Sequence, residues 1–270
     1  MTLLLLTDLH LFADPDGTLM GWPTAASFED VLASALADHK PDAILLTGDV
    51  TQDGAAAAYA RLAMRLRVAG CPCLWLPGNH DAPATMATAF APFPWMRRSV
   101  LDLPPSPNAQ WRIIALDTST PDGDHGVLPA TELQRFDAAL RAAPDRPTLV
   151  ALHHQPLPVG AAWLDAIDLH DADAFWRVVD RHPQVRGVVF GHTHQAFDAT
   201  RTGPHGGVRV LGTPATCFQF AVGTLDFGLD ARDPGYRVLD LGPDGAFTTA
   251  VHRVAVAARC APTAAGYSTH

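Results

Sequence analysis

The chain has 270 residues, of which 48% are hydrophobic, and its formal net charge is -9 at pH 7. A chain of this length can bury a full core, so it needs neither disulfides nor a structural metal merely to fold. The acidic balance argues against a nucleic-acid-binding surface, and an anionic ligand would need bound cations to reverse the local field.

The cysteines and the N-terminal segment indicate a reducing compartment. Cys71 and Cys73 stand one residue apart, which is too tight for the usual redox or zinc spacing. The apolar run at residues 3–6 has no basic residue before it, and Asp8 follows at once. We therefore predict a strand there and not a signal peptide. Since no stretch is long enough to span a membrane, we expect a cytoplasmic protein with no membrane partner.

The first third of the chain alternates short apolar runs with helical periodicity. We predict strands at residues 3–6, 43–46 and 74–76, and a helix at residues 55–68. A further helix is expected to begin near Ser27, because a capping hydroxyl there precedes Asp30 by three residues. This strand and helix order predicts parallel strands joined by right-handed crossovers.

The pattern continues more loosely through the rest of the chain. We predict helices at residues 84–90, 130–140 and 173–180, an edge strand near residues 100–103, and strands at residues 113–116, 149–152 and 188–190. Strands at 208–211, 237–241 and 247–251 follow without helices between them, so an antiparallel continuation is expected. No linker divides the sequence. We expect one domain over residues 1–258 and a flexible tail over residues 259–270.

Polar residues of the kind that bind metals follow five of the predicted strands. They are Asp8 and His10, Asp49 after Gly48, Asn79-His80-Asp81 after Gly78, His153-His154, and His192 and His194 after Gly191. In an extended chain, residues i and i+2 point to the same side, so Asp8 and His10 are expected to grip one ion together. His192 and His194 repeat this spacing.

This set is too large for one tetrahedral site with an open position. It fits two adjacent cations that share a carboxylate. Two such ions about 3.5–4 Å apart can clamp the attacking and leaving oxygens of a phosphoryl transfer. Mixed nitrogen and oxygen ligation suits transition metals better than calcium. We expect two divalent ions, iron or manganese first, with zinc or cobalt as alternatives.

The five motifs in this order (D-x-H, G-D, G-N-H-D, a His, and G-H-x-H) resemble the calcineurin-like metallophosphoesterase superfamily. The resemblance implies an α/β fold, a four-layer sandwich of two mixed β-sheets flanked by helices. It implies that Asp8, His10 and His194 bind one metal, that Asn79, His153 and His192 bind the second, and that Asp49 bridges them. It also implies that His80 faces the phosphate and stabilises or protonates the leaving oxygen, with Asp81 behind it.

The segments at residues 8–14, 76–81, 153–165 and 213–220 are similar to the bacterial class III 3′,5′-cyclic-nucleotide phosphodiesterases of the CpdA type. The likeness runs from Leu3 to about Arg253, and Gln155 departs from it. It implies that metal-bound hydroxide converts 3′,5′-cyclic AMP, a small-molecule substrate, to 5′-AMP. A monomer or a homodimer is expected.

Other interpretations stay open. The same dinuclear hydrolysis would suit another phosphodiester, such as a glycerophosphodiester or a linear dinucleotide, because the loops around the site choose the substrate. A non-catalytic scaffold with this fold would be expected to lose ligands, and a structural zinc protein would use cysteines. Trp22, Trp163 and Phe218 are open both to packing and to stacking on a base.

Overall fold

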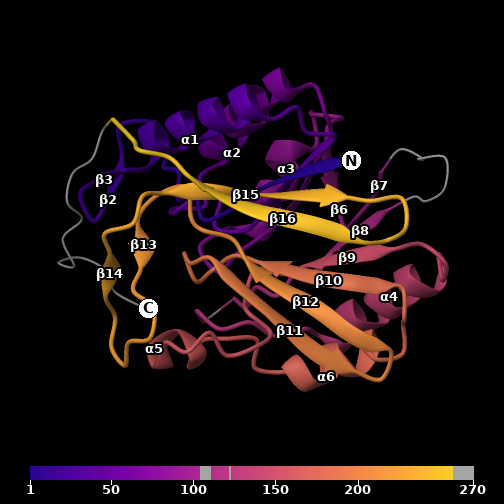
Figure 1. Cartoon of the computed structure of the whole chain (residues 1–270). Coiled ribbons are helices and arrows are strands. Elements are labelled where there is room, and N and C mark those ends of the chain that lie inside the picture. The colour runs from indigo at the N-terminus through magenta and orange to yellow at the C-terminus, as the bar shows by residue number, and fades with distance from the viewer. Residues whose placement is uncertain (104–110, 122, 258–270) are drawn as a thin grey trace.

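A computed structural model of the chain describes residues 1–103, 111–121 and 123–257. Two six-stranded mixed sheets lie face to face, with helices on both outer faces, which confirms the four-layer α/β sandwich (Figure 1). The first sheet has the order β16 (Phe247–Arg253), β15 (Gly235–Leu241), β1 (Thr2–Leu6), β4 (Ala43–Thr47), β5 (Cys73–Leu76) and β6 (Met96–Arg98). The second has the order β11 (Phe197–Gly203), β12 (Gly206–Gly212), β10 (Val185–Phe190), β9 (Thr148–Ala151), β8 (Arg112–Ala115) and β7 (Val100–Asp102).

The central strand β1 shows why the core strands are continuous apolar runs. Leu3 and Leu5 face the second sheet, whereas Leu4 and Leu6 face the helices, and all four side chains are buried. A strand covered on both faces has no polar side to display. β1 pairs in parallel with β4 and antiparallel with β15, so it lies in the middle of its sheet.

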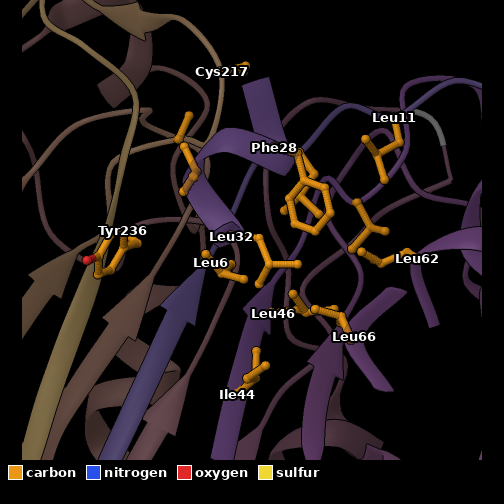
Figure 2. Packing of buried hydrophobic residues seen from close by; sticks show 14 of the residues in the cluster. Leu6, Leu11, Phe28, Leu32, Ile44, Leu46, Leu62, Leu66, Cys217 and Tyr236 are labelled. Atoms are coloured by element: carbon orange, nitrogen blue, oxygen red, sulfur yellow. The ribbon is translucent and has the colours of Figure 1, made fainter. Parts of the chain in front are cut away.

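Helices cover each sheet from outside. Over the first sheet lie α1 (Thr24–Asp38), α2 (Ala56–Leu66) with the short 3₁₀ turn η1 (Arg67–Ala69), and α3 (Pro83–Phe90). Over the second lie α4 (Ala130–Arg141) and α6 (Ala172–Val179), while α5 (Ala162–Asp165) precedes α6 in the chain. Figure 2 shows Phe28 and Leu32 of α1 gathered with Leu46 and Leu62 in the first of these outer cores. Burying each such side chain is worth about 1.5–3 kcal/mol.

The expected start of α1 at Ser27 is wrong. The helix begins at Thr24, and Ser27 is buried inside it. Its hydroxyl donates a 2.6 Å hydrogen bond to the carbonyl of Thr216, so it does not cap the helix. This bond ties α1 to the loop after β12, in which Cys217 and Phe218 also lie. The Ser27 hydroxyl therefore serves a tertiary contact with Thr216 and not the local cap that the sequence predicts.

The expected antiparallel continuation is right for β15 and β16 and incomplete for β12. β12 pairs antiparallel with β11 but parallel with β10. The reason is that β11 forms a hairpin with β12 and reverses the chain before β12 joins the sheet. β11 is not among the predicted strands. It lies at the sheet edge, and its residues alternate between half-buried and exposed, so no apolar run marks it. Two short hairpins also went unpredicted: β2 (Thr18–Leu19) with β3 (Trp22–Pro23), and β13 (Gln219–Phe220) with β14 (Leu229–Asp230).

The expected tail over residues 259–270 lies outside the described residues. Among the helices of residues 1–103, 111–121 and 123–257, none has the length and apolar character that crossing a membrane requires. The strands β1, β4 and β5 run parallel in one sheet, and β9 and β10 run parallel in the other. Their ends meet at one side of the sandwich, because His153 after β9 contacts the carbonyl of Thr47 in β4 and His192 after β10 contacts Asp8 after β1. The segments that follow them build the site.

Candidate metal centre

Five of the seven side chains expected to bind metals stand on left-handed backbone. Positive φ values occur at Asp8 (50°), His10 (47°), Asp49 (47°), His192 (64°) and His194 (48°). Residues with a Cβ rarely adopt this region, and each instance costs of order 1–3 kcal/mol. The expectation that an extended chain aligns Asp8 with His10 is therefore wrong in its reason. The two side chains converge because the chain turns sharply after β1 ends.

One group of acceptor atoms forms around His10 and His194. Their Nε2 atoms lie 3.1 Å apart. Nε2 of His194 is 3.6 Å from Oδ1 of Asp8, and Nε2 of His10 is 3.8 Å from Oδ2 of Asp49. All four side chains are buried. The structure thus brings together the residues that sequence analysis assigned to the first ion and the residue assigned to the bridge.

A second group forms around the side-chain amide of Asn79. Its Oδ1 lies 3.1 Å from Nε2 of His153 and 3.1 Å from Nδ1 of His192. Nε2 of His153 is also 3.4 Å from Oδ2 of Asp49. A single oxygen, Oδ2 of Asp49, therefore borders both groups. This is the arrangement that a carboxylate shared by two neighbouring ions requires.

The outward-facing ring nitrogens show which atoms are free to bind metal. Nδ1 of His153 lies 2.8 Å from the carbonyl of Thr47, and Nδ1 of His194 lies 2.9 Å from the carbonyl of Phe218. A carbonyl only accepts, so both Nδ1 atoms carry a proton and both Nε2 atoms face inward. Once the Nε2 atoms are deprotonated, their lone pairs converge with the carboxylate oxygens, and divalent cations fit such a set.

Burial and mutual charge dominate the electrostatics of the site. Burial raises the pKa of Asp8 to about 8 and lowers the pKa of His192 to about 3. Burial also disfavours the charge on His153, but the carboxylate of Asp49 outweighs it and raises that pKa to about 9. His153 in turn holds the pKa of Asp49 well below its usual range against the effect of burial. Each buried charge here depends on another, so added positive charge would stabilise the carboxylates.

Glycines let the segments approach each other. A Cβ on Gly78 would stand 2.1 Å from Oδ1 of Asp49 and 2.7 Å from Cε1 of His153. A Cβ on Gly48 would stand 2.4 Å from Nδ1 of His153. All three distances are far inside van der Waals contact. The glycines that precede Asp49 and Asn79 in their motifs are therefore needed for close packing of the site.

Asp81 does not occupy the position expected of it behind His80. Its carboxylate accepts hydrogen bonds from the backbone N–H groups of Val50 (3.1 Å), Thr51 (3.0 Å) and Gly78 (2.9 Å) and from the hydroxyl of Tyr59 (2.8 Å). It therefore joins the segments after β4 and β5. The side chain that contacts Nδ1 of His80, at 3.2 Å, is Gln52.

Gln52 and Tyr59 are members of the site that the sequence motifs do not include. Gln52 lies three residues after Asp49, which is the available signal that it shares the same turn. Tyr59 lies on α2 and reaches Asp81 only through tertiary packing, so no local pattern marks it. His80 itself lies beside the first group, with a ring nitrogen within 4.8 Å of ligand-type atoms of His10 and Asp49.

Residues that sequence analysis left open take structural positions. Trp22 and Phe218 are buried, which favours packing over stacking on a base. Trp163 is half-buried and contacts Phe220 with ring centroids 4.9 Å apart. Gln155, the departure from the family pattern, is buried and donates to the carbonyl of Leu164. The side chain at that departure therefore contacts α5.

Comparison with known proteins identifies the family. The model of the family described as calcineurin-like phosphoesterase matches residues 1–196. A 3′,5′-cyclic adenosine monophosphate phosphodiesterase CpdA from Vibrio vulnificus is 41% identical over 254 residues, which cover 94% of this chain and 90% of the relative. CpdA from Escherichia coli K12 is 38% identical over 256 residues, with coverage of 94% and 90%. A 3′,5′-cyclic-nucleotide phosphodiesterase from a Nostoc species is 37% identical, with coverage of 96% and 94%.

Solved structures agree at the level of the fold. A dimetal phosphatase from Danio rerio matches with a TM-score of 0.60 at 15% identity, covering 88% of this chain and 94% of that one. A purple acid phosphatase from yellow lupin seeds matches with a TM-score of 0.59 at 12% identity, covering 93% of this chain and 51% of that one. The sequence match to the family model and the shared fold lead to one conclusion: the chain belongs to the calcineurin-like phosphoesterase family.

Proposed function

We propose that this protein hydrolyses 3′,5′-cyclic AMP to 5′-AMP at a site for two divalent ions. The observation that carries the proposal is the position of Oδ2 of Asp49 between two groups of metal-binding atoms, 3.8 Å from His10 and 3.4 Å from His153. Relatives named as cyclic AMP phosphodiesterases, at 38–41% identity over most of the chain, support the substrate.

The distances between side-chain atoms divide the proposed ligands into two groups, one for each ion. The first ion is assigned to Asp8, His10 and His194, the second to Asn79, His153 and His192, and both to Asp49. Iron or manganese is proposed, with zinc or cobalt as alternatives, because the donors are imidazole nitrogens and amide or carboxylate oxygens. Such ions, when bound, supply a nucleophile at neutral pH and positive charge for the phosphate oxygens.

His80 is assigned to the leaving 3′ oxygen. Its backbone N–H donates to Oδ1 of Asp49 at 3.0 Å, which fixes the residue beside the carboxylate proposed to bridge the ions. Its side chain is half-buried and so remains accessible to a substrate. A proton or hydrogen bond delivered to the leaving oxygen is typically worth about 10²–10⁴-fold in rate. Asp81 supports this function by holding the segments around Asp49 and Asn79 together.

The remaining properties are proposed from the sequence. One metallophosphoesterase domain is proposed over residues 1–258. The protein is cytoplasmic and acts as a monomer or a homodimer on a small cyclic nucleotide, with no nucleic acid or membrane as a partner. The net charge of -9 supports the exclusion of nucleic acid.

The test is turnover of 3′,5′-cyclic AMP beside bis(p-nitrophenyl) phosphate, on metal-stripped protein with and without manganese or iron. We expect metal-dependent cleavage of both, with cyclic AMP cleaved at a competitive kcat/KM. Cleavage of the artificial diester alone would keep the two-ion site and overturn the substrate. Absence of turnover with both ions bound would favour a non-catalytic scaffold.

A further inference from the structure

The side chain of Gln52 lies between two histidines to which the proposed function gives different tasks. Its Oε1 is 2.7 Å from Nδ1 of His10, and its Nε2 is 3.2 Å from Nδ1 of His80. One amide therefore touches both a proposed metal ligand and the residue assigned to the leaving oxygen. Neither contact follows from the family motifs, which do not include this position.

The backbone holds Gln52 in place. Beyond the ends of β1 and β4, the two segments of the chain stay side by side, because the N–H of His10 donates to the carbonyl of Asp49 at 2.9 Å. The N–H of Leu11 donates to the carbonyl of Val50 at 3.0 Å, and the N–H of Gln52 donates back to the carbonyl of Leu11 at 2.9 Å. Gln52 is thus the last residue of a short backbone ladder that starts at the metal-binding residues.

The direction of each hydrogen bond follows from the chemistry of the groups. Nε2 of His10 faces His194 and Asp49, and it can bind a cation only if the ring proton sits on Nδ1. That proton needs an acceptor, and the amide oxygen of Gln52 is within 2.7 Å of it. The amide nitrogen is then the atom that faces His80. An amide NH₂ only donates, so Nδ1 of His80 must accept and the ring proton must lie on Nε2.

We propose that Gln52 is a positioning residue that sets the ring proton of His10 on Nδ1 and that of His80 on Nε2 through one amide. This inference rests on the proposed function for the task of His80. The consequence is that His80 turns an N–H, and not a lone pair, away from Gln52 toward the substrate. A carboxylate at position 52 would still accept from His10, but it would draw the proton of His80 onto Nδ1.

Two substitutions separate the two halves of the proposal. Gln52→Glu keeps the acceptor for His10 and removes the donor for His80, whereas Gln52→Met removes both at similar volume. Gln184→Met is the control: Gln184 is buried where Gln52 is half-buried, and its amide likewise makes a side-chain hydrogen bond, donating to the carbonyl of Leu140 at 3.0 Å. It precedes β10, at the opposite end of that strand from the site.

The first measurement is the ring-proton position by two-bond ¹H–¹⁵N NMR of the full chain loaded with zinc, which is diamagnetic. We expect His10 protonated on Nδ1 and His80 on Nε2 in the parent protein and in Gln184→Met. In Gln52→Glu we expect His10 unchanged and a proton on Nδ1 of His80. A parent spectrum with Nδ1 of His80 protonated, or a Glu variant with His80 unchanged, overturns the proposal.

The second measurement is zinc affinity by chelator competition. Loss of an outer partner of a ligating histidine typically weakens binding 10–100-fold. We expect that loss in Gln52→Met, and an affinity within about threefold of the parent in Gln52→Glu and Gln184→Met. Equal loss in the Glu and Met variants would mean that the residue acts through packing alone, which contradicts the proposal.

The third measurement compares leaving groups. p-Nitrophenolate leaves without a proton, whereas a ribose 3′ oxygen needs one. In Gln52→Glu we expect the ratio of kcat on cyclic AMP to kcat on bis(p-nitrophenyl) phosphate to fall about tenfold or more. An unchanged ratio with a moved proton overturns the catalytic half of the inference. Failure of the parent to cleave cyclic AMP refutes the proposed function instead, and leaves the NMR and zinc results to decide the role of Gln52.

Discussion

The hydroxyl of Tyr59, on α2, donates a 2.8 Å hydrogen bond to Oδ1 of Asp81 and accepts one from the N–H of Ala82 at 3.0 Å. This one side chain links a helix of the outer layer to the segment that carries Asn79 and His80. Burial and the nearby charge of Asp81 raise the pKa of Tyr59, so the hydroxyl keeps its proton and remains a donor. The position of the site thus depends on a helix that contributes no ligand.

Tyr59→Phe leaves a buried carboxylate oxygen and the N–H of Ala82 each with one partner fewer. We expect a loss of about 1–3 kcal/mol in the free energy of unfolding, measured by urea denaturation. Tyr236→Phe is the control, because the hydroxyl of Tyr236 makes a longer contact, 3.4 Å, to Asp38. If the Tyr59 variant and its parent have equal free energies of unfolding, the hydrogen bonds of the Tyr59 hydroxyl make no net contribution to stability.

Asn79→Ala removes the oxygen at the centre of the second group, 3.1 Å from both His153 and His192. We expect bound metal to fall from about two ions per chain to about one, and turnover to be lost with it. Elemental analysis of the purified, metal-saturated protein checks this. Retention of two ions would remove Asn79 from the ligand set.

His80→Ala should keep both ions and lower kcat for cyclic AMP by about 10²-fold or more. The reason is that His80 is not among the assigned ligands. Its ring lies beside the first group, against His10 and Gln52, and its backbone N–H donates to Asp49. Metal analysis beside steady-state kinetics separates the two effects. An unaltered kcat would exclude His80 from the reaction.

Gly78→Ala should damage the site without changing any side chain in it. The added Cβ would stand 2.1 Å from Oδ1 and 2.5 Å from the backbone N of Asp49, so the two segments must move apart. We expect a loss of about 1–3 kcal/mol in stability, by thermal or urea unfolding, together with reduced metal affinity. Gly228→Ala is the control, since its Cβ would meet Ala221 at an ordinary 3.4 Å.

Acid should destabilise the fold partly through Asp137 of α4. The carboxylate accepts from Nε2 of His182 at 2.9 Å and pairs with Arg141 and Arg181, and these contacts hold the pKa of Asp137 near 2 against a usual 3.8. A lowered pKa stabilises the folded state above about pH 4, and that stabilisation is lost as the pH falls toward 2.

Asp137→Asn should therefore lower stability at pH 7 by about 1 kcal/mol or less, since solvent screens these pairs, and should flatten the stability profile between pH 4 and 2. Urea unfolding at a series of pH values measures both effects. Asp226→Asn, at an exposed position, should leave the profile as it is in the parent. If the free energy of unfolding of the Asp137 variant falls between pH 4 and 2 as steeply as that of the parent, Asp137 does not contribute to acid destabilisation.

The core of the fold could be predicted because its strands are buried on both faces. The runs around Leu4, Ile44 and Val150 contain no polar side chain, and an apolar run bounded by turn residues needs no tertiary information to be recognised. β11 lacked this signal because it lies at an edge of its sheet, with Asp198, Thr200 and Thr202 exposed. The helix start predicted at Ser27 is wrong because a local capping pattern cannot reveal that the Ser27 hydroxyl bonds a carbonyl 189 residues away.

The sequence was enough to predict which residues form the site, but not how they are arranged. Residue types and motif order were enough to name Asp8, His10 and Asp49 as metal-binding candidates, and the structure groups them. The reason for their convergence was not predictable, since left-handed backbone at an aspartate or histidine leaves no mark in the sequence. The partners of Asp81 and the contacts of Gln52 depend on how two loops lie against each other, which only the folded chain defines.

The left-handed turns at Asp8, His10, Asp49, His192 and His194 set stability and activity against each other. Glycine adopts this conformation without strain, so replacing any of these residues with glycine would relieve the backbone while deleting a ligand. A directed-evolution screen that selects for thermal stability alone would therefore favour glycine at these proposed ligand positions, and such variants would be inactive. Engineering of a more robust form has to select for turnover and for melting temperature in the same round.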